Sequence, residues 1–218
     1  SKSGKLVVGS CDSALSVWDP ASSWSCVGRL EGHDQWVTSV CSLPDGRVAS
    51  GSYDDTIKIW NIDNPVMVCE MTLNGHTYEV RSLCVDKNGW LISGSFDSEI
   101  RVWEIITGAC LRVMRGHTDW ISALVTLENG RVVSGSLDGT IKVWDTTSGT
   151  CQATLDGFGH SIAYSICSLR GGGFASGHDD TRIRIWLSPS STPFFNKGCH
   201  DSFICVKVLE GQKDIIRS

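Results

Sequence analysis

A pattern with a period close to 42 residues runs along this chain and decides most of what it can fold into. Five tryptophans, Trp18, Trp60, Trp103, Trp144 and Trp186, are spaced 42, 43, 41 and 42 residues apart. Other residue types keep the same register around each tryptophan. Such regular spacing indicates one supersecondary unit repeated along the chain, because unrelated domains have no reason to share a period.

Each complete copy contains a Gly-His pair, a serine, an aspartate and the tryptophan, in that order. The fullest copy has Gly116-His117, Ser134-Gly135-Ser136, Asp138 and Trp144-Asp145. The four sets are His33, Ser50, Asp54 and Trp60; His76, Ser93, Asp97 and Trp103; His117, Ser134, Asp138 and Trp144; and His160, Ser176, Asp180 and Trp186.

The residues between these markers predict short strands. In the third complete copy, β-rich runs cover residues 121–127, 131–136, 140–144 and 150–155, and polar or glycine-containing turns separate them. This arrangement is typical of a four-stranded antiparallel meander. One such sheet cannot cover both of its own faces, so neighbouring copies must do so. The fold class predicted is therefore all-β, a β-propeller of four-stranded antiparallel blades.

The Gly-His pair, the Ser-Gly-Ser strand, the turn aspartate and the Trp-Asp ending resemble the WD-repeat (WD40) family. The resemblance covers nearly the whole chain, and several motifs keep register together. It implies that the His, Ser, Asp and Trp of each set form a hydrogen-bonded network inside one blade. Imidazole and indole groups need such partners when they are buried.

A fifth, degenerate copy is divided between the two ends of the chain. Gly4, Val8, Asp12 and Trp18 match its later half, and Gly211-Gln212 matches its beginning. We expect residues 215–218 to supply the inner strand of the blade built from residues 6–30. The chain would then be one domain, 1–218, with five blades at approximately 1–30 plus 212–218, 33–73, 76–114, 117–155 and 160–209. The alternative is part of a seven-bladed propeller.

The cysteines favour an intracellular protein, cytoplasmic or nuclear. Five of them occupy one slot of the repeat, four residues before an apolar residue: Cys26, Cys69, Cys110, Cys151 and Cys205. Equivalent slots lie a whole repeat apart, too far for the ~4.4–6.8 Å Cα separation of a disulfide. We expect these thiols to be reduced and to belong to the core. No stretch approaches the ~20 apolar residues of a membrane span.

Neither catalysis nor a cofactor is indicated. The Ser, His and Asp of each set could suggest a nucleophile, yet the trio recurs in every complete copy, and a triad is defined by geometry rather than by composition. His178-Asp179-Asp180 and Cys199-His200-Asp201 lack the paired spacing of a zinc site. The prediction is no enzyme, no catalytic residue, no metal and no cofactor. The net charge of −5 argues against nucleic acid.

The positions that differ between copies predict the recognition surface. In the WD-repeat family, the loop with Gly-His and the turn before the aspartate face one rim, which commonly binds partners. The candidate partner-binding residues on this rim are Trp36, Tyr53, Tyr78, Glu79, Phe96, Trp120, Leu137 and Asp179. Clustered exposed aromatics suit a binding hot spot. Asp34, Glu79, Asp119 and Asp179 make the rim acidic, which favours a basic protein or peptide partner.

One segment breaks the period. Residues 188–198 are rich in serine and proline and predict a long loop between the third and outer strands of their blade. Taken together, these features predict a non-enzymatic protein-interaction scaffold that presents a loop-lined rim with clustered aromatics. The alternatives are the substrate-recognition module of a ubiquitin ligase and a subunit of an RNA-processing complex.

Overall fold

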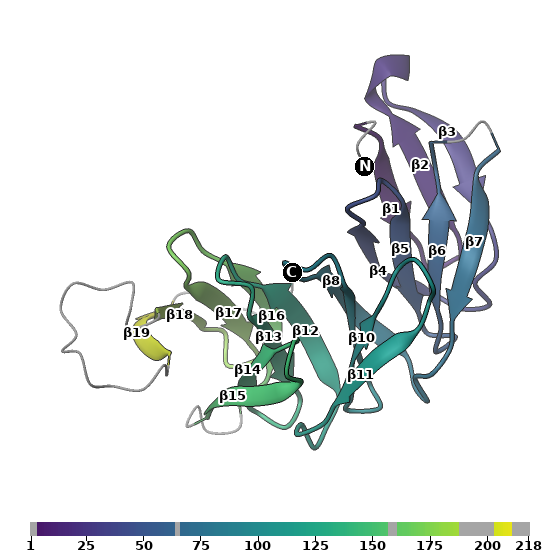
Figure 1. Cartoon of the computed structure of the whole chain (residues 1–218). Helices are drawn as coiled ribbons and strands as arrows, with labels where there is room; N and C mark the ends of the chain where they lie inside the picture. The colour runs from purple at the N-terminus through teal and green to yellow at the C-terminus, as the bar shows by residue number, and fades with distance from the viewer. Residues whose placement is uncertain (1–3, 64–65, 157–160, 188–202, 211–218) are drawn as a thin grey trace.

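The computed structural model describes residues 4–63, 66–156, 161–187 and 203–210, and these form five antiparallel sheets in chain order (Figure 1). The first sheet has three strands, β1 (Leu6–Gly9), β2 (Leu15–Asp19) and β3 (Ser25–Leu30), with a short 3-10 helix (Pro20–Ser22) before β3. The other four sheets have four strands each. The prediction of an all-β, antiparallel fold is confirmed.

The four-stranded sheets repeat one plan. The second contains β4 (Val37–Ser42), β5 (Val48–Ser52), β6 (Ile57–Asn61) and β7 (Val68–Leu73); the third contains β8 (Val80–Val85), β9 (Leu91–Ser95), β10 (Ile100–Trp103) and β11 (Cys110–Met114). The fourth contains β12 (Ile121–Thr126), β13 (Val132–Ser136), β14 (Ile141–Asp145) and β15 (Thr150–Leu155); the fifth contains β16 (Ala163–Ser168), β17 (Phe174–His178), β18 (Ile183–Leu187) and β19 (Ile204–Leu209). In every sheet the strands follow chain order.

The sheets stand side by side along an arc, with their first strands innermost and their last strands outermost (Figure 1). Across the described residues, the extensive contacts between different sheets join only consecutive ones, through β1–β4, β4–β8, β8–β12 and β12–β16. Inner-strand hydroxyls reinforce these contacts. The amide of Leu83 donates to Ser39 Oγ at 3.1 Å, and that of Leu124 donates to Ser82 Oγ at 3.0 Å.

The core lies between consecutive sheets rather than inside any one of them. One cluster, for example, joins Ile92 and Ile100 of the third sheet to Ile121 and Leu124 of the fourth. The second strand of each four-stranded sheet is covered on both faces and is buried throughout. Such a strand needs small residues where the next sheet approaches closely.

The central glycine of the Ser-Gly-Ser strand marks that close approach. A Cβ built on Gly94 would lie 2.5 Å from Cγ2 of Ile121, and one built on Gly135 would lie 2.9 Å from the carbonyl oxygen of Ala163. Neither distance leaves room for a methyl group. The repeated glycine therefore lets the inner strand of one sheet pack directly on the second strand of the sheet before it.

Four of the five slot cysteines are exposed, so the prediction that they belong to the core is wrong for those four, whereas Cys205 packs against the core cluster between the fourth and fifth sheets. Each lies on the outermost strand of its sheet and pairs with the repeat tryptophan at a β-bulge, as Cys151 does with Trp144. Cys26, Cys69, Cys110 and Cys151 are exposed, and Cys205 is half-buried. The cysteine-to-leucine spacing predicted the common slot correctly, but it carried no information about which face of the outer strand is covered. The nine described cysteines are all free thiols.

Two further predictions concern the ends of the fifth sheet and of the chain. Strand β18 ends at Leu187 and β19 begins at Ile204, so the long connection does fall between the third and outer strands, while residues 188–202 themselves lie outside the described residues. The proposed inner strand at residues 215–218 also lies outside them. Among the described residues, the first sheet has no counterpart of the innermost strand of the other four sheets.

Candidate protein-interaction face

The repeated polar residues form one connected network in each of three sheets. In the fourth sheet, Nδ1 of His117 lies 2.7 Å from Oδ2 of Asp138, and Nε2 lies 2.7 Å from Oγ of Ser134. The indole Nε1 of Trp144 donates to the same Oγ at 2.8 Å. The second and third sheets repeat this geometry through His33, Ser50, Asp54 and Trp60, and through His76, Ser93, Asp97 and Trp103.

The network fastens the histidine loop to the turn that contains the aspartate. Asp138 also accepts hydrogen bonds from the amides of Thr118 at 3.1 Å and Thr140 at 2.8 Å. Burial alone would raise the pKa of the Asp138 carboxyl, but the hydrogen bonds from His117 and Thr140 outweigh burial and lower the pKa. Asp54 shows the same balance: burial raises its pKa, but the hydrogen bonds from His33 and Thr56 outweigh burial, so the pKa is lowered.

These trios are not placed to act as nucleophiles. Ser134 is completely buried, and its hydroxyl is already bonded to both an indole and an imidazole. A substrate could reach its Oγ only by dismantling the blade, and the same holds for Ser50 and Ser93. The geometry is that of a buried structural network. In the part of the chain that the structure describes, no group of three His, Cys, Asp or Glu residues is placed to hold a metal ion.

The fifth sheet departs from the pattern. His160 lies outside the described residues, while Nε2 of His178 lies 2.7 Å from Oγ of Ser176. Its Nδ1 lies 3.4 Å from the carbonyl oxygen of Ser161. Asp180 accepts from the guanidinium of Arg184 at 2.5 and 3.1 Å. The Trp186 indole still donates to Ser176, at 2.9 Å.

The sequence pattern did not predict His178 as a network residue, because His178 occupies a position at which the other three complete copies have a serine. The equivalent Ser52, Ser95 and Ser136 each donate to a loop carbonyl, as Ser136 does to Asp119 at 2.9 Å. Sequence alignment of the copies could have shown the exception. Burial, and then the charge of Arg184, lower the pKa of His178 from 6.5 to about 4.

This lowered pKa predicts a loss of stability in mild acid. An unfolded histidine binds a proton below pH 6.5, before the folded one does, so the stabilisation from neutral His178 is complete above pH 6.5 and is lost as the pH falls toward 4. We expect about 2 kcal/mol less unfolding free energy at pH 5 than at pH 7 from this group. Urea titrations of the wild type and His178→Ser at both pH values measure it. An equal decrease in both proteins would contradict this role.

The predicted rim residues are joined in pairs by the backbone. The amide of Tyr53 donates to the carbonyl of Trp36 at 2.9 Å, and that of Phe96 donates to Glu79 at 3.0 Å. Leu137 and Trp120 pair at 2.9 Å, and Asp179 and Ile162 pair at 3.1 Å. The loop before each inner strand and the turn before each aspartate therefore lie at the same end of the sheet.

Four of these side chains form a continuous row of rings, which we call the aromatic ladder: Trp36, Tyr53, Phe96 and Trp120. Trp36 stacks on Tyr53 with ring centroids 5.5 Å apart, and Phe96 stacks on Trp120 at 4.1 Å with an interplanar angle of 9°. Tyr53 and Phe96 meet at 6.2 Å in a tilted contact. The ladder crosses from the second sheet to the fourth, so residues far apart in sequence share one surface.

The ladder is accessible at both ends. Trp36 is 52% exposed and Trp120 is 45% exposed, while Tyr53 and Phe96 are half-buried between them. Tyr78 is 60% exposed but makes none of the ladder's ring contacts. The remaining predicted residues, Glu79, Leu137 and Asp179, are half-buried, and the Asp179 carboxylate accepts from Ser161 Oγ and from the Ile162 amide.

Carboxylates surround the ladder. Asp55 follows Tyr53 and Asp54 in the same turn, and its pKa is raised by burial and by the nearby charges of Glu79, Asp54 and Asp97. The sequence prediction of an acidic rim omitted Asp55. Its αL conformation, with φ of 66°, is shared by Ser98, Thr181 and Gly139 at the same turn position. Arg81, on β8, lines a pocket of about 190 Å³ among the inner strands, together with hydroxyl residues such as Ser122 and Ser165.

The family model "WD domain, G-beta repeat" matches residues 24–61, 67–104, 108–145 and 149–186. These matches cover well over half of the chain, which therefore belongs to the WD-repeat family. Each match begins at or near the outermost strand of one sheet and ends in the third strand of the next sheet or one residue after it. One sequence repeat thus contributes strands to two neighbouring sheets and links them covalently.

Individual relatives match only short parts of the chain. Mitochondrial division protein 1 of Schizosaccharomyces pombe is 39% identical over 64 residues, which are 29% of this chain and 10% of that protein. The Notchless protein homolog of Arabidopsis thaliana is 41% identical over 58 residues, 26% of this chain and 12% of that protein. The guanine nucleotide-binding protein subunit beta of Saccharomyces cerevisiae is 48% identical over 64 residues, 28% and 15% respectively. No helix in the described ranges is long and apolar enough to cross a membrane.

Proposed function

We propose that this chain is a non-enzymatic interaction scaffold that binds a protein or peptide partner on the face carrying the aromatic ladder. The observation that carries the proposal is the continuous stack from Trp36 to Trp120 across three sheets. Surface rings that are already stacked lose little freedom on binding, and aromatic residues dominate interface hot spots. Among the relatives, one is named as a subunit and another, from Saccharomyces cerevisiae, as Ribosome assembly protein 4, which agrees with a role in assemblies.

The partner proposed for this face is basic. Burial raises the pKa of the Asp55 carboxyl first, and the negative charges of Glu79 and Asp97 raise it further, so carboxylates are close together at this turn. Asp34, Asp119 and Glu79 extend that charge beside the ladder. A lysine- or arginine-bearing segment would be attracted, and its cations could lie over the ring faces. The phosphates of a nucleic acid would be repelled by these carboxylates. We also propose that the protein is located in the cytoplasm or nucleus.

Binding of a random peptide library tests this function. The best ligand selected on the wild type is expected to bind the double variant Trp36→Ala/Trp120→Ala at least about tenfold more weakly than it binds the wild type, because both exposed ends of the ladder are lost. Trp24→Ala is the matched control, since Trp24 is 57% exposed but lies beside β3, away from the ladder. Equal affinity of the wild type, the double variant and Trp24→Ala would contradict binding of the ligand at the aromatic ladder.

The fold proposal is a single domain, 1–218, with five blades, of which residues 212–218 complete the first. The first sheet supports it, because no described strand pairs with the inner edge of β1, and such an edge is a site for another strand. Amide exchange of β1 tests closure. We expect the β1 amides to exchange slowly in the full chain and rapidly in a chain that ends at residue 211. Rapid exchange in the full chain would favour an open segment of a larger propeller.

A further inference from the structure

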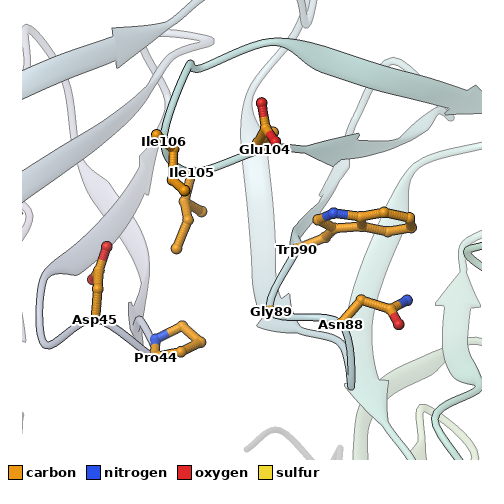
Figure 2. Close-up of a pocket in the computed structure, with 8 residues that line it drawn as sticks. All are labelled: Pro44, Asp45, Asn88, Gly89, Trp90, Glu104, Ile105 and Ile106. Atoms are coloured by element: carbon orange, nitrogen blue, oxygen red, sulfur yellow. The ribbon is translucent and has the colours of Figure 1, made fainter.

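The face opposite the ladder contains a pocket between the second and third sheets. It has a volume of about 420 Å³ and is lined chiefly by Pro44, Asp45, Trp90, Glu104, Ile105 and Ile106. These residues come from the turns that follow β4, β8 and β10, and antiparallel strands put those turns at the end away from the ladder. Figure 2 shows Trp90 on one side of the pocket, and Ile105, Ile106, Pro44 and Asp45 across from it.

The repeat supplies an internal comparison. The equivalent turns of the third and fourth sheets form a pocket of about 310 Å³, whose lining includes Lys87, Arg131, Thr147 and Gln152. Within the copies, Trp90 stands where Arg47 and Arg131 stand, each directly after the turn glycine. Ile106 stands where Asp63 and Thr147 stand, three residues after the repeat tryptophan. The blade therefore does not need an apolar residue at either position.

The two apolar residues at these positions, Trp90 and Ile106, line the same pocket. Ile106 is 77% exposed, and Trp90 is half-buried against the core cluster between the third and fourth sheets. Pro44 also keeps the pocket open. A Cβ built on Gly89 would lie 3.6 Å from Pro44 Cγ, whereas one built on Gly130 would lie 2.1 Å from Cδ of Lys87, which covers the equivalent position. Exposed apolar surface that the fold does not require is typical of a binding site.

The walls of the pocket are held in place. The guanidinium of Arg47 donates to the carbonyl of Ile105 at 2.6 Å, which ties the second sheet to the third. It also pairs with Asp45 at 2.7 Å and with Glu70 at 3.3 Å. A site whose walls are fixed beforehand loses less entropy on binding.

The charge around the pocket is negative. Two carboxylates, Asp45 and Glu104, line it, and no lysine or arginine does. Arg47 lies beside the pocket, where two carboxylates, Asp45 and Glu70, share its guanidinium, and neither of these ion pairs involves Glu104. A cation at the mouth would therefore be attracted, while an acidic ligand would be repelled.

We propose that this pocket binds a segment of a partner protein in which one large apolar side chain is flanked by lysine or arginine. The apolar side chain packs between Trp90 and Ile106, and the flanking cation lies near Glu104. The volume lies within the ~300–1,000 Å³ range of ligand pockets. This site is separate from the aromatic ladder, so the scaffold has two binding faces and can join two partners.

The test uses three synthetic probe peptides: leucine between two lysines, leucine between two glutamates, and serine between two lysines, each in the same glycine-rich host. Methyl and indole resonances of the full chain are followed by NMR during titration. The lysine–leucine–lysine peptide is expected to shift the Ile106 methyl and Trp90 indole signals. It should bind about tenfold more tightly than either other peptide. Equal binding of the two leucine peptides would overturn the charge argument, and no shift at either residue would overturn the site.

The matched variant is Trp90→Arg with Ile106→Thr, which installs the residues of the fourth sheet and so should keep the fold. It is expected to lose the lysine–leucine–lysine peptide while retaining the ligand of the aromatic ladder. Loss of both ligands would instead indicate general damage and contradict two independent sites. Concentration-dependent dimers that disappear in the variant would show that the occupant is a second copy of this chain, which also overturns the proposal.

Discussion

Replacing Ser134 by alanine is expected to lower the free energy of unfolding by about 2 to 5 kcal/mol, a large effect for the removal of one oxygen atom. The Ser134 hydroxyl meets both Nε2 of His117 and Nε1 of Trp144, at 2.7 and 2.8 Å. All three residues are buried, so water cannot replace the hydroxyl. The substitution leaves two buried polar groups without their partner, and each costs about 1–3 kcal/mol.

Urea denaturation measures this loss, and two comparisons isolate its cause. Ser148→Ala removes an exposed turn hydroxyl of the same copy and should change stability by less than about 0.5 kcal/mol. Trp144→Phe removes the indole donor, so the double variant with Ser134→Ala should be less destabilised than the sum of the two single variants. Additive losses would mean that the indole–hydroxyl bond contributes nothing to the stability of the blade.

Breaking the aromatic ladder at its centre is expected to weaken partner binding about 30-fold to 100-fold in Phe96→Ala. Phe96 stacks on Trp120 at 4.1 Å and meets Tyr53 at 6.2 Å, so its removal separates the ladder into two halves. The effect should exceed that of either exposed end, because hot spots lie at the centre of an interface. Calorimetric titration with the best library ligand gives the affinity.

Phe96→Tyr is the control for this prediction. Tyrosine already occupies the same turn position in the second sheet as Tyr53, so the ring and its stacking should be kept. This variant is expected to bind within about threefold of the wild type. A comparable loss in Phe96→Tyr and Phe96→Ala would mean that the turn backbone, rather than the ring, determines affinity.

The parts of the fold that repeat were predictable from the sequence because they depend on local patterns. The expected strands at 121–127, 131–136, 140–144 and 150–155 agree closely with β12 to β15. Turn glycines and apolar alternation set those boundaries, and both act within a few residues. The buried strand with its central glycine follows in the same way, since only a small residue fits where the next sheet approaches.

Other features depend on contacts that no short pattern encodes. The spacing of the cysteines showed a shared slot but could not tell the covered face of an outer strand from the open one, and Cys151 proved exposed. His178 meets Ser176 because both lie on β17 with one residue between them, an arrangement hidden by the regular histidine marker of the other copies. The sequence predicted that aromatics gather on one rim, but not that Trp36, Tyr53, Phe96 and Trp120 would stack into a ladder.

The pocket around Trp90 shows what a repeat can reveal once its copies are compared. Arginine in two copies and tryptophan in a third, at one backbone position, separate what the blade needs from what this chain has added. The same comparison applies to the ladder, where Tyr53, Phe96, Leu137 and Asp179 share one turn position. Residues common to all copies build the sheets, and residues that differ are candidates for recognition.

Hydrogen–deuterium exchange with the best library ligand bound tests the central claim most directly, because it locates the partner without altering the protein. The account predicts slower exchange in the loops and turns that carry the ladder, residues 33–36, 53–56, 96–99 and 117–120, with the outer strands β7, β11 and β15 unchanged. Protection confined to the outer strands, with those loops exchanging as in the free protein, would contradict it.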